Sequence, residues 1–475
     1  MVMLTDAASE PAGSARTLEE IIADQERAFC ERQPRSAALT ERAARSIPGG
    51  ASSNWAVSRP AIVWVDRGDG SKVWDADGRE YVDFHAGYGV MVVGHNHPAV
   101  TEAVQRRIAK GSHFAQPTED AIVVAENLAA RFGLPKWRFS NSGTEATMDA
   151  VHLIRAITGR DLVVKIEGSY HGHHDALMVS TFNSAKQIGP IERPIAVAGN
   201  GGIPQAMVDL CIVVPFNDLA AAERAFADNE GRVAGMIVEP MMMNASMIPP
   251  QPGYLEGLRA LTRRHDALLV FDEVKTGLSI AAGGAVERFG VRPDIVCLAK
   301  ALGGGLPCGA IGGTDDVMSA IVSGVYDQVG TFNANPLTMA AARATLTEVL
   351  TSDAYERVER LSTAMLDESL AIVKGAGLAA FGRSMGAKGC LVFNDAPLHN
   401  YREFLHVDPA LSHAHWLFQH NGGVFLPPWG KSEQWTMSVQ HTPADTQHYI
   451  DNVATFATAV AQAADLRENR YTGTY

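Results

Sequence analysis

The sequence places an amine and three carboxylates directly after apolar runs, where strands of a buried sheet would end. Lys300 follows "DIVCLA" and precedes three glycines, Asp272 and Glu273 follow "ALLVF", and Glu239 follows "VAGMIV". The carboxyl ends of parallel strands share one edge of a sheet, and ligands bind outside that edge. We therefore expect these side chains to lie around one site.

Lys300 is the residue of this set with the clearest chemical meaning. Lysine is usually a surface residue, whereas Lys300 stands between an apolar run and a glycine-rich turn. Burial lowers the pKa of an amine, so a buried lysine becomes a nucleophile able to form an imine with a carbonyl group. The alternative is a lysine at the sheet edge whose charged end reaches water.

An anion-binding turn is predicted where a strand-like segment runs through Ser142, Gly143 and Thr144 into a helix. Backbone N–H groups at the start of a helix can bind a phosphate, and the two hydroxyl groups add donors. The alternative for this turn is an ordinary helix cap. A buried Asp272 would need a cationic partner or several hydrogen bonds, and its alternative is a carboxylate that caps a turn.

One ligand would use all three features. Its phosphate would bind the turn at residues 142–144, its aldehyde would react with Lys300, and its ring nitrogen would pair with Asp272. Pyridoxal 5'-phosphate (PLP) has these three groups, and a carboxylate that keeps its ring nitrogen protonated makes the ring an electron sink. The residues therefore predict PLP as the cofactor.

The elements that must position these residues are predicted to form an α/β protein. Between about residues 98 and 312, strand-like apolar runs alternate with helical stretches, which predicts a mostly parallel sheet covered by helices. We divide the chain into a disordered tail (1–15), N-terminal helices with a small antiparallel meander (16–85), a large PLP-binding domain (86–335) and a C-terminal α+β domain (336–475).

Composition argues against several classes of function. The net charge of −13 and the lack of a stripe rich in lysine and arginine speak against a nucleic-acid partner. We find no signal peptide and no apolar stretch of the roughly 20 residues that cross a bilayer. The five cysteines are scattered without a CxxC pair, which predicts the reducing cytoplasm and neither disulfides nor a metal site.

Longer motifs resemble the class III PLP-dependent aminotransferases. "VFDEVKTG" precedes "LAKALGGGLPCGAIGG", and "NSGTEATMDAVHLIRAITGR", "GSYHGHHDA", "VEPMMMN" and "GTFNANPLTMAA" stand in the family's order. The resemblance extends from about Ser46 to His441. It implies a fold-type I PLP enzyme, with a large domain and a small α+β domain built from both chain ends. "IPGGASSNWAV" and "HAGYGVMVVGHNHP" are most similar to glutamate-1-semialdehyde aminomutase and its relatives, which include β-amino-acid aminotransferases.

The resemblance also implies roles for individual residues. Lys300 matches the lysine that forms the imine and moves a proton between substrate and cofactor, and Asp272 matches the partner of the ring nitrogen. Tyr170 matches the aromatic residue over the ring, whereas the neighbouring His171 is interpreted as packing. The other matches are Ser142, Gly143 and Thr144 at the phosphate, Glu239 and Asn244 near the phenolic oxygen, and Thr331 at the phosphate of a partner subunit. The last match implies a homodimer with shared active sites.

The sequence departs from the aminomutase pattern where that pattern binds the substrate carboxylate. Ala56 stands where the aminomutase has an arginine, Ser53 where β-amino-acid enzymes have one, and Arg59 lies three residues after Ala56. Near the C-terminus, Lys431 and Glu433 lie in a segment without arginine, and Glu433 aligns with a glutamate of the aminomutase. A planar two-point contact to a carboxylate is therefore missing, and lysine is not an equal replacement for it.

We place the substrate next to Ser53, Trp55, Tyr88, Lys431 and Glu433. Trp55 and Tyr88 are predicted to line an apolar pocket, with core packing as the alternative. The function predicted first is a cytoplasmic aminotransferase that acts on a small-molecule amine and a keto acid or aldehyde. The alternatives are an aminomutase, which moves an amino group between adjacent carbons of one substrate, and a protein that holds the cofactor without catalysis.

Overall fold

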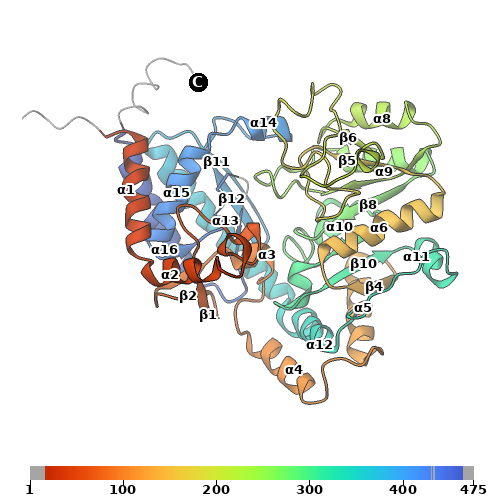
Figure 1. The fold of residues 1–475 in the computed structure, drawn as a ribbon, viewed down its shortest axis with the longest axis horizontal. Helices are drawn as coiled ribbons and strands as arrows, with labels where there is room; N and C mark the ends of the chain where they lie inside the picture. Colours follow the sequence, from red (N-terminus) through yellow and green to blue (C-terminus); the bar gives the residue numbers. More distant parts are fainter. Residues whose placement is uncertain (1–15, 429, 432–433, 464–475) are drawn as a thin grey trace, which may run out of the picture.

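The computed structural model describes residues 16–428, 430–431 and 434–463. Figure 1 shows two lobes: the middle of the chain forms the lobe with the large sheet, and segments from both ends form the other. The tail predicted at residues 1–15 lies outside the described residues. None of the helices in the described residues has the length and apolar character that a membrane span requires.

The large sheet is mostly parallel, as the alternating apolar runs predict. Its strands are β4 (Lys136–Ser140), β5 (Leu162–Ile166), β6 (Cys211–Val214), β7 (Val233–Val238), β8 (Leu268–Asp272), β9 (Ile295–Leu298) and β10 (Gly309–Gly313). They lie in the order β4-β10-β9-β8-β7-β5-β6, and only β10 runs antiparallel to its neighbours. Strands β5 and β7 are buried along their whole length, as expected when helices cover both faces.

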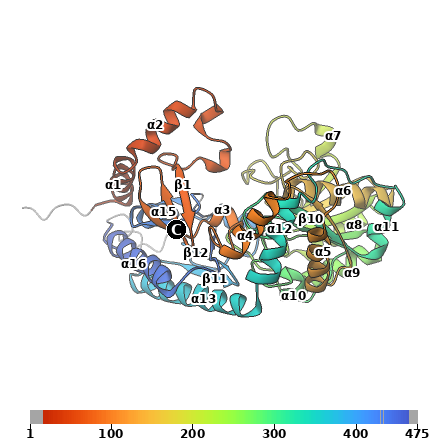
Figure 2. The same ribbon diagram turned by 90° about the horizontal axis from the view of Figure 1, so that it is seen from below.

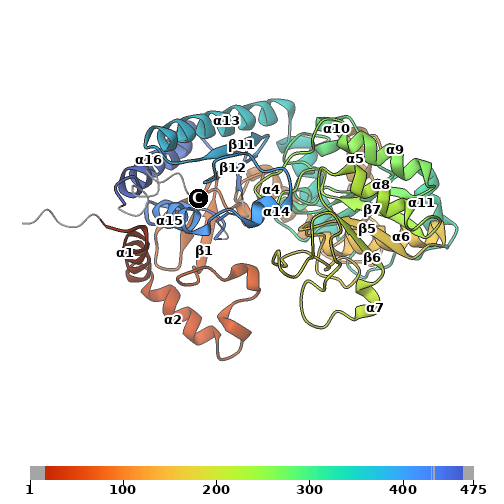
Figure 3. The same cartoon turned by 90° about the horizontal axis from the view of Figure 1, so that it is seen from above.

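Helices cover both faces of this sheet. They are α4 (Pro98–Ile108), α5 (Glu119–Phe132), α6 (Gly143–Thr158), α7 (Gln205–Val208), α8 (Leu219–Ala227), α9 (Tyr254–Arg264), α10 (Gly284–Phe289), α11 (Asp315–Val322) and α12 (Pro336–Ala344). Helix α6 begins after the capping residue Ser142 and ends at Gly159, whose φ of 65° suits glycine. Its apolar face packs on one side of the sheet, and α8 and α9 pack on the other (Figure 3).

The small lobe contains two further sheets. One has the order β1-β2-β3-β13 and consists of β1 (Val65–Asp69), β2 (Lys72–Asp75), β3 (Glu80–Asp83) and β13 (Val424–Phe425). The other consists of β11 (Phe381–Met385), β12 (Lys388–Val392) and β14 (Trp435–Thr436). The first three strands form the predicted antiparallel meander, and β13 adds a parallel strand from the far end of the chain.

Helices from both chain ends complete the small lobe. They are α1 (Leu18–Glu31), α2 (Pro34–Ala43), α3 (Ala86–Gly89), α13 (Ser352–Gly375), α15 (Pro409–Asn421) and α16 (Pro443–Val460). The short helix α14 (Tyr401–Leu405) contacts the large lobe, where Arg402 pairs with Glu167. Helix α1 packs on α15, where the rings of Phe29 and Trp416 lie 5.6 Å apart. The predicted fold class, with a small α+β part built from both chain ends, is confirmed.

Helix α12 belongs to the large lobe. The sequence predicts that this segment opens the C-terminal domain, but α12 packs on α4 and α5 (Figure 2). A π-helical turn at Thr345–Val349 follows it, and α13 is the first element after α12 that packs in the small lobe. The predicted boundary at residues 335 and 336 therefore falls inside a packed group of helices, and the division into domains stays a prediction.

Candidate active site

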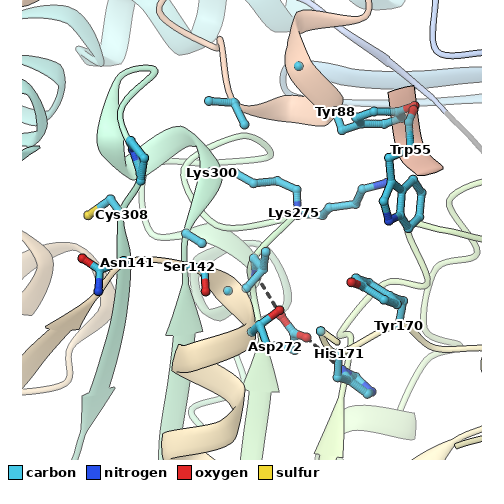
Figure 4. Close-up of a pocket in the computed structure, with 18 of the residues that line it drawn as sticks. Trp55, Tyr88, Asn141, Ser142, Tyr170, His171, Asp272, Lys275, Lys300 and Cys308 are labelled. Atoms are coloured by element: carbon cyan, nitrogen blue, oxygen red, sulfur yellow. Dashed lines mark hydrogen bonds and ion pairs between the residues drawn. The ribbon is translucent and has the colours of Figure 1, made fainter. Parts of the chain in front are cut away.

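A cavity of about 460 Å³ lies at the carboxyl edge of the large sheet and is lined by residues from both lobes (Figure 4). Strand β8 ends at Asp272, and β9 ends two residues before Lys300. The residues predicted from the sequence that line it are Trp55, Tyr88, Ser142, Gly143, Thr144, Tyr170, Glu239, Asn244, Asp272 and Lys300. The shared sheet edge thus brings together side chains that are far apart in the sequence.

Lys300 lies on a strained turn directly after β9. It has a φ of 48°, which is uncommon for a residue with a side chain and costs on the order of 1–3 kcal/mol. The tight turn continues through Gly304, where a Cβ atom would lie 2.5 Å from the hydroxyl oxygen of Thr345. The glycines that follow Lys300 therefore serve a turn that presents this amine to the cavity.

Asp272 is buried at the base of the cavity and already has two partners. Its Oδ1 accepts a hydrogen bond from the backbone N–H of Val274 at 3.0 Å, and its Oδ2 lies 2.8 Å from Nδ1 of His171. His171 is fully buried, and burial lowers its pKa although Asp272 acts in the opposite direction. Within the described residues Nε2 of His171 has no hydrogen-bond partner. His171 thus contacts a proposed site residue, beyond the packing role interpreted from the sequence.

The start of α6 faces the cavity. Ser142 caps this helix, because its Oγ accepts the N–H of Glu145 at 3.2 Å. The amides of Gly143 and Thr144 belong to the first helical turn and have no acceptor within the helix, so they remain suited to an anion. A Cβ atom at Gly143 would lie 2.9 Å from both methyl groups of Val274, which explains a glycine here. Ser142 can therefore cap the helix while the amides of Gly143 and Thr144 are suited to an anion.

Glu239, Asn244 and Lys275 form a hydrogen-bonded chain along one side of the cavity. Glu239 accepts the N–H groups of Tyr170 and Met243, each at 3.2 Å, and the amide of Asn244 at 3.5 Å. Nζ of Lys275 donates to Oδ1 of Asn244 at 2.7 Å. Burial raises the pKa of Glu239 to about 7, helped by the charge of Asp272 and opposed by Lys275.

Aromatic side chains form the opposite wall. The ring of Trp55 lies 5.5 Å from Tyr88, 5.6 Å from Tyr170 and 6.0 Å from Phe182. Tyr88 donates a hydrogen bond from its hydroxyl group to the carbonyl of Trp55, and its φ of 59° belongs to a short left-handed stretch that starts at Ala86. Trp55 and Tyr88 therefore line the cavity, as predicted, from a segment of the small lobe.

Several predicted substrate residues lie elsewhere. Nζ of Lys431 donates to the carbonyls of Val407 at 2.8 Å and Leu405 at 3.4 Å and lies outside the cavity. Ser53 lines a neighbouring cavity of about 370 Å³, which shares Trp55 and Tyr88 with the first. Lys431 and Ser53 therefore do not line the cavity that contains Lys300 in this chain, and their contact with the substrate stays a prediction. Glu433 lies outside the described residues.

Three further residues of interest lie away from the cavity lining. Arg59 and Thr331 are exposed and do not line the cavity of this chain. Glu273, which follows Asp272, accepts the N–H groups of Ala285 and Val286 at the start of α10. Glu273 therefore caps a helix, although its position in the sequence suggests a site residue.

The sequence interpretation also missed a buried lysine that shapes the site. Lys165 in β5 is fully buried, and its ammonium group donates to the carbonyls of Ser169, Leu177 and Val179 at 2.6–3.1 Å. Burial lowers its pKa to about 8. These bonds hold the segment that carries Tyr170 and His171 against the sheet. The sequence signal was a lone lysine inside the apolar run "LVVKI".

Comparison with known proteins decides the family. The family model for aminotransferase class-III matches residues 54–398. The chain belongs to the class III aminotransferases. The curated glutamate-1-semialdehyde 2,1-aminomutase 2 of Brevibacillus brevis is 36% identical over 422 residues, which cover 88% of this chain and 96% of the relative.

Two solved structures are similar along nearly the whole chain. An omega-transaminase from Sphaerobacter thermophilus has a TM-score of 0.85 and 34% identity, covering 91% of this chain and 98% of its own. A glutamate-1-semialdehyde aminomutase from Pseudomonas aeruginosa in complex with PMP has a TM-score of 0.84 and 30% identity, covering 93% of this chain and 98% of its own. The class III aminotransferase is thus similar to enzymes of both reaction types.

PLP is the cofactor of this class III aminotransferase, and the residues around the cavity fit it. The first turn of α6 offers backbone donors to a phosphate, and the buried carboxylate of Asp272 offers an acceptor to a protonated ring nitrogen. Lys300 offers an amine in the same cavity. The start of α6, Asp272 and Lys300, from which the sequence predicts PLP, therefore lie around the same cavity.

Proposed function

We propose that the protein is an aminotransferase, which takes an amino group from an amine or amino acid and passes it to a keto acid or aldehyde. The observation that carries this proposal is the convergence of Lys300, Asp272 and the start of α6 on one cavity. Such a set binds PLP and handles the proton transfers of transamination. A protein that merely held the cofactor would have no need of all three features.

In this proposal each side chain has a separate task. PLP supplies an aldehyde and an electron-withdrawing ring when it is bound. The amides of Gly143 and Thr144 would bind the phosphate, and Tyr170 would cover the ring. Asp272, held by His171, would keep a proton at the ring nitrogen, and Lys300 would remove and return the proton at the substrate carbon.

A second candidate function is glutamate-1-semialdehyde aminomutase, which the names of the curated relatives favour. The two functions differ in stoichiometry. An aminotransferase changes its cofactor absorbance with a donor amine alone and then needs a second substrate to complete the cycle. An aminomutase turns over one substrate without a keto-acid partner. A screen of donors and acceptors, followed by the absorbance change of each half-reaction, separates the two functions.

We expect the purified protein to convert glutamate-1-semialdehyde to 5-aminolevulinate poorly. Ala56 stands where the aminomutase pattern has its arginine, and truncation of one partner of a buried charge pair typically costs about 2–5 kcal/mol. At about 1.4 kcal/mol per factor of ten, the loss is on the order of 30- to several-thousand-fold in affinity. The measurement is the KM for glutamate-1-semialdehyde. Efficient conversion would replace the aminotransferase proposal with the aminomutase.

We also propose a homodimer in which Thr331 reaches the cofactor of the partner subunit. Apolar side chains gather beside Thr331, where Val329 is 84% and Phe332 is 59% exposed. Obligate dimer interfaces are apolar and bury on the order of 2,000 Å² or more.

The free thiols of all five cysteines support the cytoplasm as the place of action.

A matched pair of variants tests the proposed dimer. Val329→Asp should shift the protein to monomers and remove activity, because a charge would be buried in the interface. Val65→Asp, on an exposed residue of β1 in the small lobe, should leave the dimer intact. Light scattering at the assay concentration gives the mass of the active species. A monomer with full activity contradicts the proposal.

A further inference from the structure

A second cavity lies beside the one that contains Lys300. Its volume is about 370 Å³, and Trp55, Gly87 and Tyr88 line both cavities. In Figure 4 the side chains of Trp55 and Tyr88 lie next to each other at one end of the Lys300 cavity, with their rings 5.5 Å apart. A ligand that contacts Trp55 in the first cavity is therefore adjacent to the second.

The lining of the second cavity is aromatic and aliphatic. Besides the shared residues it includes Val63, Trp416, Phe425, Leu426 and Pro428. Among the described residues that line it there is no lysine, arginine, aspartate or glutamate, and the histidine is His85. The ring of His85 stacks on Phe425 at 5.2 Å, and its Nδ1 accepts the N–H of Tyr88 at 3.3 Å. This lining favours an uncharged, apolar group over a carboxylate.

Polar atoms of the cavity wall already form hydrogen bonds within the chain. Nε1 of Trp416 donates to the carbonyl of Leu426 at 3.0 Å, and Tyr88 donates from its hydroxyl group to the carbonyl of Trp55. The hydroxyl group of Ser58 donates to the carbonyl of Ala61. The cavity therefore offers a ligand mainly apolar surface.

The second cavity is large enough for an aromatic ring. An apolar cavity of about 150 Å³ is sufficient to bind benzene, and the second cavity exceeds this size. Ser53 and Ala56 line it and are exposed, but neither lines the cavity that contains Lys300. These are the two positions at which the related patterns have an arginine, and in this chain they contribute no charge to the cavity.

We propose that the second cavity binds an aryl group of the substrate while the amine of the same substrate lies at Lys300. The substrate is then an arylalkylamine or an amino acid with an aryl side chain, and this inference rests on the proposed aminotransferase function. The short chain between amine and ring would lie along Trp55 and Tyr88, and the ring would lie against Trp416 and Phe425. The distance from the amine to the ring thus selects the substrate.

The first test measures binding without reaction. 3-(4-Fluorophenyl)propan-1-ol carries the ring but no amine, and fluorine NMR follows its titration into the PLP-loaded protein. Wild type should bind it, and Ala56→Phe, which fills part of the second cavity, should weaken this binding about 10-fold or more, since burial of such a ring contributes roughly 10- to 100-fold. Ala56→Leu should have a smaller effect. The melting temperature of each variant reports its folding.

A control variant adds the same ring elsewhere. Ala220→Phe places it at an exposed position of α8, outside the lining of both cavities, and should leave binding of the aryl alcohol unchanged. A wild type that does not bind the aryl alcohol would overturn the proposal. Unchanged binding in Ala56→Phe would do the same, because the ring would then bind outside the second cavity.

The second test uses donors that differ in the distance from amine to ring. Benzylamine, phenylethylamine, phenylpropylamine and phenylbutylamine are compared with propylamine through the absorbance change of the cofactor. The ratio of kcat/KM for the best aryl amine to that for propylamine should fall about 10-fold in Ala56→Phe. An unchanged ratio would contradict the proposal. If binding of the aryl alcohol depends on Ala56 while no amine changes the absorbance, the aminotransferase function fails and the aryl-binding cavity stands.

Discussion

Replacing Lys300 with alanine should lower turnover by about 10⁴-fold or more, because one amine both bonds to the cofactor and moves the substrate proton. The phosphate-binding turn at the start of α6 does not depend on Lys300, so Lys300→Ala should still bind part of the cofactor. Its thermal stability should change little, since the side chain is half-buried. Turnover, cofactor content and melting temperature are measured on the same preparation.

The covalent partner of the cofactor is identified by borohydride reduction and peptide mapping. The experiment is demanding here, because Lys275 brings a competing amine into the same cavity. Wild type should carry the cofactor on the peptide that contains Lys300, and Lys300→Ala should lose this label. A label on Lys275 in the wild-type protein would transfer the covalent role to that residue. Lys374→Ala, on the exposed side of α13, is the matched control for loss of a lysine and should keep full turnover.

Asp272→Asn should slow the chemical step about 10²–10³-fold, the range seen when one preorganised electrostatic contact is removed from a site. The ring nitrogen would lose the anion that holds its proton, so the ring would withdraw electrons less strongly. Binding of the cofactor should weaken less, because a hydrogen bond to a charged group contributes about 1.5–3 kcal/mol. Single-turnover absorbance with a donor gives the rate, and equilibrium dialysis gives the affinity for PLP.

The contact between Asp272 and His171 provides the comparison for this variant. His171→Gln keeps the carboxylate of Asp272 but removes the imidazole whose Nδ1 lies 2.8 Å from its Oδ2. This variant should therefore slow the chemical step less than Asp272→Asn does. Equal losses in rate and in cofactor affinity for Asp272→Asn would mean that Asp272 shapes the cavity without tuning the ring. If His171→Gln slows the chemical step more than Asp272→Asn does, the proton that this step depends on is assigned to His171.

The fold was predictable where strands consist of apolar runs. The run that ends at Asp272 and the run before Lys300 became neighbouring parallel strands, β8 and β9. Strand β10 was not predicted, because "GAIGG" contains three glycines and reads as a turn. Its position between β4 and β9 depends on close approach: a Cβ atom at Gly312 would lie 2.5 Å from the Trp137 ring. Such long-range packing leaves no periodic pattern in the sequence.

The site was predictable where its residues end strands or begin helices. Lys300, Asp272 and the turn that starts with Ser142 meet because the sheet edge is common to all of them. Lys431 does not line the cavity of this chain, since its ammonium group donates to the carbonyls of Leu405 and Val407, and its contact with the substrate stays a prediction. The position of Lys275 in the cavity became visible only in three dimensions, because in the sequence it looks like one more residue of a strand-end motif.

The pairing of β13 with β3 has a consequence for synthesis of the protein. It joins Val424 to Val82, which are 342 residues apart (424 − 82), and α15 supplies the partner of α1 from the same late part of the chain. On the ribosome, all seven strands of the large sheet emerge before β13 does. The edge of β3 in the N-terminal meander therefore stays unpaired until β13 is synthesised. An unpaired strand edge can form hydrogen bonds with strands of other chains. Nascent chains truncated before β13 should aggregate through this edge, whereas completed chains close it.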